Sequence, residues 1–262
     1  MLCSSMARGL AGAGVITVIL DIDEKAAQRV SAEISGESGV PSYGYRADVL
    51  DRKSLEEVRG RIRDEIGEID LLINGAGGNS PKATTGLEQI TEEMLDRLEE
   101  GFFGLELEGF QRVFDLNFTG TLLPTMVFTR DMVSKQKGVV LNVSSMNAYR
   151  PLTKIPAYSA AKASINNFTQ WLAVHFARVG VRVNAIAPGF FLTRQNRFLL
   201  TDEKTGALTP RGEKIIASTP MGVFGEPEDL TGTVLYLLSD LSGFITGICI
   251  PVDGGYSAYG GV

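Results

Sequence analysis

Apolar residues recur along the chain in short runs that alternate with longer amphipathic stretches. The runs are rich in β-branched residues and end in polar ones, as Val139–Val143 ends before Ser144 and Ser145. Such runs predict buried strands, and stretches with apolar residues three or four positions apart predict helices. The pattern predicts strands over residues 15–20, 42–47, 69–74, 139–143, 181–187 and 248–252.

The stretches between these runs predict helices over residues 4–13, 54–66, 110–135, 157–179 and 227–238. A further helix begins at Glu24, where Asp23 is a suitable N-cap. Pro124 predicts a kink or a break inside its helix, because proline has no amide hydrogen to donate. The alternation of strands and helices predicts an α/β fold of the Rossmann type, with a doubly wound parallel sheet between two helical layers.

The N-terminal segment does not match the start of such a fold. A Rossmann-type dinucleotide site opens with a strand and a glycine-rich turn that leads into a helix N-terminus. Residues 1–10 already have the pattern of that helix, so the first strand and the glycine-rich turn are expected to be missing. Either Met1 is an internal methionine of a longer protein, which we favour because the later motifs are intact, or the protein is a variant that binds dinucleotide weakly or not at all.

Length and composition narrow the class of protein. A sequence of 262 residues with 44% hydrophobic residues is expected to form one domain, residues 1–262. The net charge of −6 and the pI near 5.0 argue against a nucleic-acid surface. The opening residues lack a basic region and a long apolar run, which argues against export and a membrane span. Cys3 and Cys249 suggest no disulfide framework, so a cytoplasmic location is expected.

Tyr158 and Lys162 stand four residues apart on a predicted helix, and Ser145 ends the strand before it. A free phenol has a pKa near 10, and an ammonium within about 4–6 Å favours its ionised form. This spacing therefore predicts that Lys162 lowers the pKa of Tyr158, which would act as a general acid or base. The pair alone is common on solvated helix faces, so its weight comes from the order of the surrounding strands.

With Asn117, these residues resemble the active-site pattern of the short-chain dehydrogenase/reductase family, from about residue 4 to the C-terminus. The resemblance implies a nicotinamide-dependent enzyme in which Tyr158 exchanges a proton with a secondary alcohol or ketone. It also implies that Ser145 binds the substrate oxygen and that Lys162 binds the nicotinamide ribose. Asn117 would link Lys162 to solvent, and the subunits would form a homotetramer.

Asp21 indicates which dinucleotide is used. A carboxylate at this strand end can accept hydrogen bonds from a ribose 2′-hydroxyl and repels a 2′-phosphate, so NAD is expected in preference to NADP. Gly75 stands where the family usually has a second asparagine. The resemblance places further residues beside the dinucleotide: Asp48, Val49, Asn74, Ala76, Gly77, and Pro188 together with Thr193 at the nicotinamide end.

Several segments, including 77–85, 144–154 and 253–262, resemble the D-mannonate oxidoreductases, or fructuronate reductases, of this family. The implied reaction interconverts D-mannonate and D-fructuronate. A sugar acid needs a cation for its carboxylate and polar groups for its hydroxyls. The candidate substrate-binding residues are Asn79, Lys82, Asn147, Arg150, Lys154 and Gln195.

Several alternatives stay open. A gluconate 5-dehydrogenase or another sugar or polyol dehydrogenase is a related possibility, and a cofactor-deficient scaffold is one of another class. Residues 82–109 are longer than the corresponding stretch of the family, and we interpret them as a substrate-side insertion or as a surface excursion without ligand contact. A serine hydrolase and a metal enzyme are disfavoured, because His175 is the single histidine and points away from Tyr158.

Overall fold

The computed structural model describes residues 1–193, 196–202 and 205–261. Its strands are β1 (Thr17–Asp21), β2 (Ser42–Arg46), β3 (Leu71–Asn74), β4 (Gly138–Val143), β5 (Val181–Pro188) and β6 (Cys249–Val252). Its α-helices are α1 (Leu2–Gly12), α2 (Glu24–Ser38), α3 (Arg52–Glu65), α4 (Leu107–Phe114), α5 (Gly120–Ser134), α6 (Pro156–Phe176), α7 (Arg197–Leu200), α8 (Pro210–Ala217) and α9 (Thr231–Leu238). All six predicted strands are confirmed, and so is the N-cap at Asp23, whose side chain accepts a hydrogen bond from the Ala26 amide.

The strands are parallel and lie in two groups. β1 pairs with β2, and the other four are ordered β3-β4-β5-β6. Among the described residues no hydrogen bonds join β1 to β3, so the sheet is interrupted where the sequence predicted a missing strand. The predicted α/β class with a parallel sheet is confirmed.

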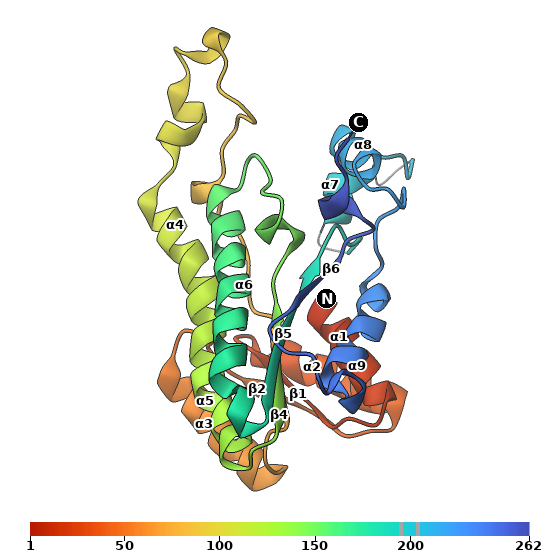
Figure 1. Cartoon of the computed structure of the whole chain (residues 1–262). Coiled ribbons are helices and arrows are strands. Elements are labelled where there is room, and N and C mark those ends of the chain that lie inside the picture. Colours follow the sequence, from red (N-terminus) through yellow and green to blue (C-terminus); the bar gives the residue numbers. More distant parts are fainter. Residues whose placement is uncertain (194–195, 203–204, 262) are drawn as a thin grey trace.

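Helices cover both faces of the longer group, as Figure 1 shows. α3, α5 and α6 pack on one face around Leu55, Phe128 and Val140, and α1 and α9 pack on the other around Leu141 and Leu237. Neighbouring residues of β4 pack on opposite faces of the sheet, because successive side chains of a strand point to alternate faces. The apolar run Val139–Leu141 of β4 is therefore buried on both sides, and the strand's one polar side chain, that of Asn142, is buried and hydrogen-bonded.

The helix does not break at Pro124, and the alternative, a kink there, stays a prediction. Pro124 is buried inside α5, and the irregular part of this long helix is a π turn at Asp115–Thr119, which joins α4 to α5. A π turn commonly marks a functional site. Asn117 lies in this turn, and its carbonyl oxygen accepts a hydrogen bond from Thr121 Oγ1 at 2.9 Å. The pattern also missed the short helices α7 and α8.

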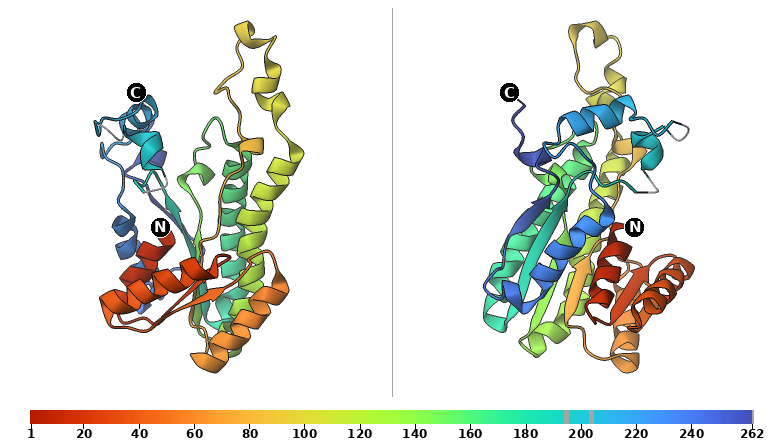
Figure 2. Two further views of the ribbon diagram at one scale, coloured as in Figure 1. Left: turned by 180° about the vertical axis from the view of Figure 1, so that it is seen from behind. Right: turned by 90° about the vertical axis from the view of Figure 1, so that its right-hand side faces the viewer.

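Residues 84–106, here called the arm, project beyond the body of the molecule at the N-terminal ends of α4 and α6 (Figure 1). Figure 2 shows the same projection from two further sides. The base of the arm is fixed by two backbone hydrogen bonds, from the Thr85 amide to the Lys154 carbonyl at 2.9 Å and from the Glu106 amide to the Lys82 carbonyl at 3.0 Å. Because Lys154 lies just before α6, the arm begins beside the loop that leads into the Tyr158 helix.

Candidate active site

The carboxyl ends of the strands and the loops that follow them bring the predicted residues to one edge of the sheet. Ser145 follows β4, Tyr158 and Lys162 lie in the first turns of α6, and Asn117 lies in the π turn. Crossover connections of parallel strands return each segment to the same edge, which is where open α/β sheets bind ligands.

The Ser145 hydroxyl lies close enough to the Tyr158 hydroxyl to affect its pKa. Ser145 is 8% exposed and also accepts a hydrogen bond from the Asn147 amide at 3.3 Å. Burial raises the pKa of Tyr158, and the Ser145 hydroxyl opposes this by lowering it. The pair therefore presents two adjacent hydroxyl oxygens that can share one substrate oxygen.

Lys162 is 3% exposed, and its Nζ donates a hydrogen bond to the Val143 carbonyl at 2.9 Å. Nζ lies over the Tyr158 ring, 5.7 Å from its centroid. The prediction that Lys162 lowers the pKa of Tyr158 is wrong for the protein by itself, because burial dominates and raises that pKa. Burial also lowers the pKa of Lys162 to about 8, since no carboxylate among the described residues compensates its charge.

Asn117 is completely buried and clamps the loop after β3. Its Nδ2 donates to the carbonyls of Gly78 and Val113, both at 2.7 Å, and its Oδ1 accepts from the Gly78 amide at 3.3 Å. A Cβ at Gly77 would lie 2.6 Å from Asn117 Oδ1 and 3.1 Å from Lys162 Nζ. The four predicted catalytic residues are thus brought together, with Asn117 and Lys162 flanking the backbone of Gly77.

Sequence reasoning missed Ser144. Its Oγ donates to Asn166 Oδ1 at 2.6 Å and lies 3.2 Å from the Lys162 carbonyl, so it fixes α6 against the end of β4. The signal was the pair of adjacent serines at the end of an extended strand. Alternating side chains send Ser145 to the substrate side and Ser144 to the helix side.

The ends of β1 and β2 carry the predicted adenosine-side residues. Asp21 is exposed and accepts the Asp23 amide on one carboxylate oxygen at 3.0 Å, which leaves the second oxygen available. Asp48 accepts the Leu50 amide at 2.9 Å, and Val49 packs beside Gly120. These side chains line the same edge as Gly77, where the missing Cβ lets the backbone lie against Asn117 and Lys162.

Other predicted dinucleotide residues have partners within the protein. The Asn74 amide is buried and donates to Thr125 Oγ1 and Asn142 Oδ1, both at 2.9 Å, so its side chain joins β3 to β4 and α5. Thr193 donates from its amide and its hydroxyl to Asn196 Oδ1 at 2.8 and 3.0 Å. Ala76 precedes Gly77, and Pro188 ends β5 at the same edge of the sheet.

Two of the positively charged residues predicted to bind substrate form ion pairs or hydrogen bonds within the protein. Lys82 Nζ forms ion pairs with Glu106 at 3.0 Å and Glu108 at 2.9 Å, and these partners raise the pKa of Lys82. Arg150 donates to the carbonyls of Tyr256 and Tyr259, at 3.2 and 2.6 Å. Lys82 and Arg150 therefore have partners within the protein, and their contact with a substrate carboxylate stays a prediction.

The other predicted substrate residues differ in their surroundings. Asn79 Nδ2 donates to Thr84 Oγ1 at 2.9 Å. Asn147 is 4% exposed, and its Oδ1 is buried without a hydrogen-bond partner in the described part of the protein. Lys154 is exposed and forms no ion pair with the residues that the structure describes. Gln195 lies outside the described residues.

Arg150→Ala is expected to make residues 256–261 more mobile, because Arg150 donates hydrogen bonds to the carbonyls of Tyr256 and Tyr259. A hydrogen bond to a charged donor contributes about 1.5–3 kcal/mol, so exchange of the Tyr259 amide, which donates to the Tyr256 carbonyl, should become roughly tenfold faster or more. Hydrogen exchange with mass spectrometry measures this change. Tyr149→Phe, which removes only the hydrogen bond from the neighbouring phenol to the Cys249 carbonyl, is the control and should leave the exchange unchanged.

Lys162 is expected to make stability depend on pH in a defined direction. The folded protein releases the Lys162 proton near pH 8, whereas the unfolded state keeps it up to about pH 10.5. The unfolded state then binds more protons, so the unfolding free energy rises with pH in this window, by roughly 3 kcal/mol in total.

Denaturant titrations of wild type and Lys162→Met between pH 7 and 10.5 test this. Tyr158, Cys3 and Cys249, whose pKa values burial raises, act in the opposite direction but occur in both proteins. The difference between the two unfolding free energies therefore reports Lys162 together with its interaction with Cys3, and a difference that stays constant with pH contradicts the prediction.

The described residues contain neither a candidate metal site nor a helix suited to cross a membrane. No cluster of three or more histidine, cysteine or acidic side chains suited to a metal ion was found among them. None of the helices in this part of the protein is both long and apolar enough to span a membrane. Both cysteines are free, as predicted.

Comparison with known proteins gave consistent matches over the whole sequence. Residues 2–257 match the family model described as enoyl-(acyl carrier protein) reductase. An uncharacterized oxidoreductase UxuB of Bacillus subtilis is 52% identical over 100% of this chain and 93% of its own length. An uncharacterized oxidoreductase of Haemophilus influenzae is 50% identical over 100% of this chain and 91% of its own.

A similar solved structure is that of a candidate D-mannonate oxidoreductase from Haemophilus influenza with bound NAD. It is 50% identical, covers 100% of this chain and 93% of its own, and superposes with a TM-score of 0.93.

Proposed function

The protein belongs to the short-chain dehydrogenase/reductase family, and on that premise we propose that it is an NAD-dependent oxidoreductase interconverting a secondary alcohol and a ketone on a sugar acid. The proposed pair is D-mannonate and D-fructuronate. The observation that carries the proposal is the buried contact of Ser145 with Tyr158, with Lys162 over the phenol ring.

The residues at the sheet edge fit a dinucleotide. The exposed carboxylate of Asp21 suits a ribose diol, and Gly77 lets the loop after β3 lie against Lys162, because any Cβ there would clash with Asn117 and Lys162. The Lys162 ammonium is buried without a carboxylate among the described residues, so ribose hydroxyls would complete its hydrogen bonds. These three residues would hold NAD, which when bound supplies the hydride acceptor.

The protein side of the reaction is a proton exchange. Tyr158 takes the proton from the substrate hydroxyl during oxidation and returns it during reduction. Ser145 donates a hydrogen bond to the substrate oxygen and keeps it beside the phenol. Desolvation raises the pKa of Tyr158, and Ser145 is the described side chain that opposes this and favours the ionised phenol. Asn117 fixes the loop at Gly78, so that these groups keep their relative positions.

The sugar-acid assignment is supported by the relative described as a candidate D-mannonate oxidoreductase. Lys154 is an exposed cation four residues before Tyr158 and can meet a substrate carboxylate. We also propose a cytoplasmic location, a single dinucleotide-binding domain over residues 1–262 and a substrate-side role for residues 82–109. A cofactor-deficient scaffold is the alternative if the protein fails to bind NAD.

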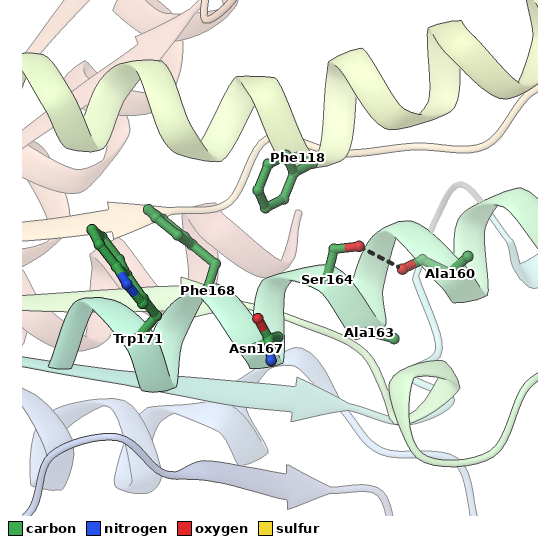
Figure 3. Close-up of a pocket in the computed structure, with 7 residues that line it drawn as sticks. All are labelled: Phe118, Ala160, Ala163, Ser164, Asn167, Phe168 and Trp171. Atoms are coloured by element: carbon green, nitrogen blue, oxygen red, sulfur yellow. Dashed lines mark hydrogen bonds between the residues drawn. The ribbon is translucent and has the colours of Figure 1, made fainter. Parts of the chain in front are cut away.

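We further propose a homotetramer that uses the outer face of α6. A groove there is lined by Phe118, Ala160, Ala163, Ser164, Asn167, Phe168 and Trp171 (Figure 3). Trp171 is 57% exposed and Val174 80%, although both are large apolar side chains. A contiguous apolar surface of this kind is typical of subunit interfaces.

The reaction is tested by following NAD reduction at 340 nm with D-mannonate, D-gluconate and a panel of uncharged polyols. We expect turnover with D-mannonate and little with the polyols, because the latter lack a carboxylate for a cation to bind. Preference for gluconate would move the assignment to gluconate 5-dehydrogenase. Absence of NAD binding in calorimetry, together with absence of turnover, would instead support the scaffold.

A further inference from the structure

We propose that the arm, residues 84–106, docks on the opposite end of the α5–α6 face of a second copy of this protein. Its charge partners there would be Arg130, Lys137 and Arg178. The inference rests on the homo-oligomer proposed above. It adds a contact between the arm and a second subunit, the relative orientation of the two subunits, and the residues that form the contact.

The arm exposes large apolar side chains that the described part of its own subunit does not cover. Leu95 is 62% exposed, Phe102 66% and Phe103 59%. The two phenylalanine rings contact each other edge to face, with centroids 5.6 Å apart. The arm is held by short 3₁₀ turns and has no core of its own. Aromatic and aliphatic side chains grouped in this way are typical anchors of a protein interface.

The charge of the arm limits which surface can cover it. Seven of the 31 acidic residues and one of the 25 basic residues lie within residues 84–106. The arm therefore carries a net charge of −6, equal to that of the whole protein, and the remaining residues balance to zero. Two arms would repel each other, so the partner surface must be a basic region outside the arm.

Four acidic side chains of the arm remain available for such a partner. Within the described part of the protein, Glu88 pairs with Lys214, Glu100 with Arg97 and Glu106 with Lys82. The others are exposed and form no ion pair with any described residue: Glu92, Glu93, Asp96 and Glu99.

A basic group with matching properties lies at the far end of the same helical layer. Arg130, Lys137 and Arg178 are near the C-terminal ends of α5 and α6, are exposed, and have no ion pair among the described residues. Acidic neighbours at this end are engaged elsewhere, since Glu68 and Asp70 pair with Lys135 and Asp131 pairs with Arg59.

Symmetry then selects one arrangement. α4, the π turn and α5 form one rod, with the acidic arm at its start and the basic group at its end (Figure 1). A two-fold axis perpendicular to this rod places the arm of each copy on the basic end of the other. A two-fold axis parallel to the rod would place the two acidic arms at the same end. In a two-fold symmetric dimer each contact occurs twice. With the perpendicular axis, the acidic arm of each copy therefore meets the basic group of the other.

Charge reversal tests the contact. The arm variant carries Glu92→Lys, Glu93→Lys and Asp96→Lys, and the helix-end variant carries Arg130→Glu, Lys137→Glu and Arg178→Glu. Each is expected to raise the subunit dissociation constant roughly tenfold or more at low salt, measured by sedimentation. Because every altered side chain is exposed, the fold should persist, and circular dichroism checks this.

The protein that combines both sets of substitutions should regain the wild-type dissociation constant. A matched control, with Glu24→Lys, Glu57→Lys and Glu213→Lys on three other helices, makes the same charge change as the arm variant and should leave association unchanged. If wild type associates and the arm variant associates equally well, the arm contact is overturned while the homo-oligomer stands. If wild type is monomeric, both are overturned. NAD-linked turnover, measured on the same samples, reports on the proposed reaction separately.

Discussion

Tyr158→Phe is expected to lower turnover by roughly 10²- to 10⁴-fold, the range that a positioned acid or base contributes. The substitution removes one oxygen atom, the one that accepts the substrate proton, and leaves the ring in place. Tyr158 lies beside the Ser145 hydroxyl and under the Lys162 ammonium, so no other described phenol can replace it. Initial rates of NAD reduction, with the substrate found in the panel above, measure the effect.

Tyr149→Phe is the matched control for this prediction. It removes the same atom from a tyrosine on the loop after β4, where the hydroxyl donates to the Cys249 carbonyl at 2.8 Å. We expect that variant to retain turnover within a few-fold of wild type. NAD affinity should be nearly unchanged in Tyr158→Phe, and a rate close to wild type in that variant would refute the acid/base role.

Gly77→Ala is expected to lower turnover by about 10²-fold or more. The substitution removes no reacting group and acts by displacing Lys162 or the loop that carries Gly77. The added Cβ would lie 2.6 Å from Asn117 Oδ1 and 3.1 Å from Lys162 Nζ, closer than ordinary van der Waals contact. Asn117 is held by three hydrogen bonds, so Lys162 or the loop must move. A displacement of about 1 Å at a reacting group can cost 10²-fold in rate.

Gly78→Ala provides the comparison for this second prediction. A Cβ at Gly78 meets only Leu116 Cδ2, at 3.3 Å, which is the end of a side chain that can rotate. We expect NAD affinity from calorimetry to fall in Gly77→Ala and to change little in Gly78→Ala. Equal effects of the two substitutions would show that the loop as a whole, and not its contact with Lys162, is sensitive.

Much of the fold was predictable because the signals are local. The apolar runs predicted all six strands, and the carboxylate of Asp23 predicted a helix start that the structure places at Glu24. The order of Asn117, Ser145, Tyr158 and Lys162 identified the edge of the sheet where the site lies. Parallel strands bring the residues after their carboxyl ends to one edge, whatever the details of side-chain packing.

The partners of charged side chains could not be predicted where those partners are distant in the sequence. Lys82 and Arg150 are cations in suitable loops, but Glu106 and the Tyr256 carbonyl bind them. Periodicity could not show this, because the partners are 24 and 106 residues away in the sequence. The helix continues through Pro124 without a break, and its irregular turn lies at residues 115–119.

The sequence by itself determined the elements of this protein and their parallel arrangement, and it predicted which residues gather at the carboxyl edge of the sheet. Only the tertiary structure decided the charge states there. The pKa of Tyr158 is raised and that of Lys162 is lowered to about 8, because both groups are buried. Spacing along a helix fixes which side chains are neighbours, but their ionisation depends on how much water and opposing charge the rest of the fold leaves around them.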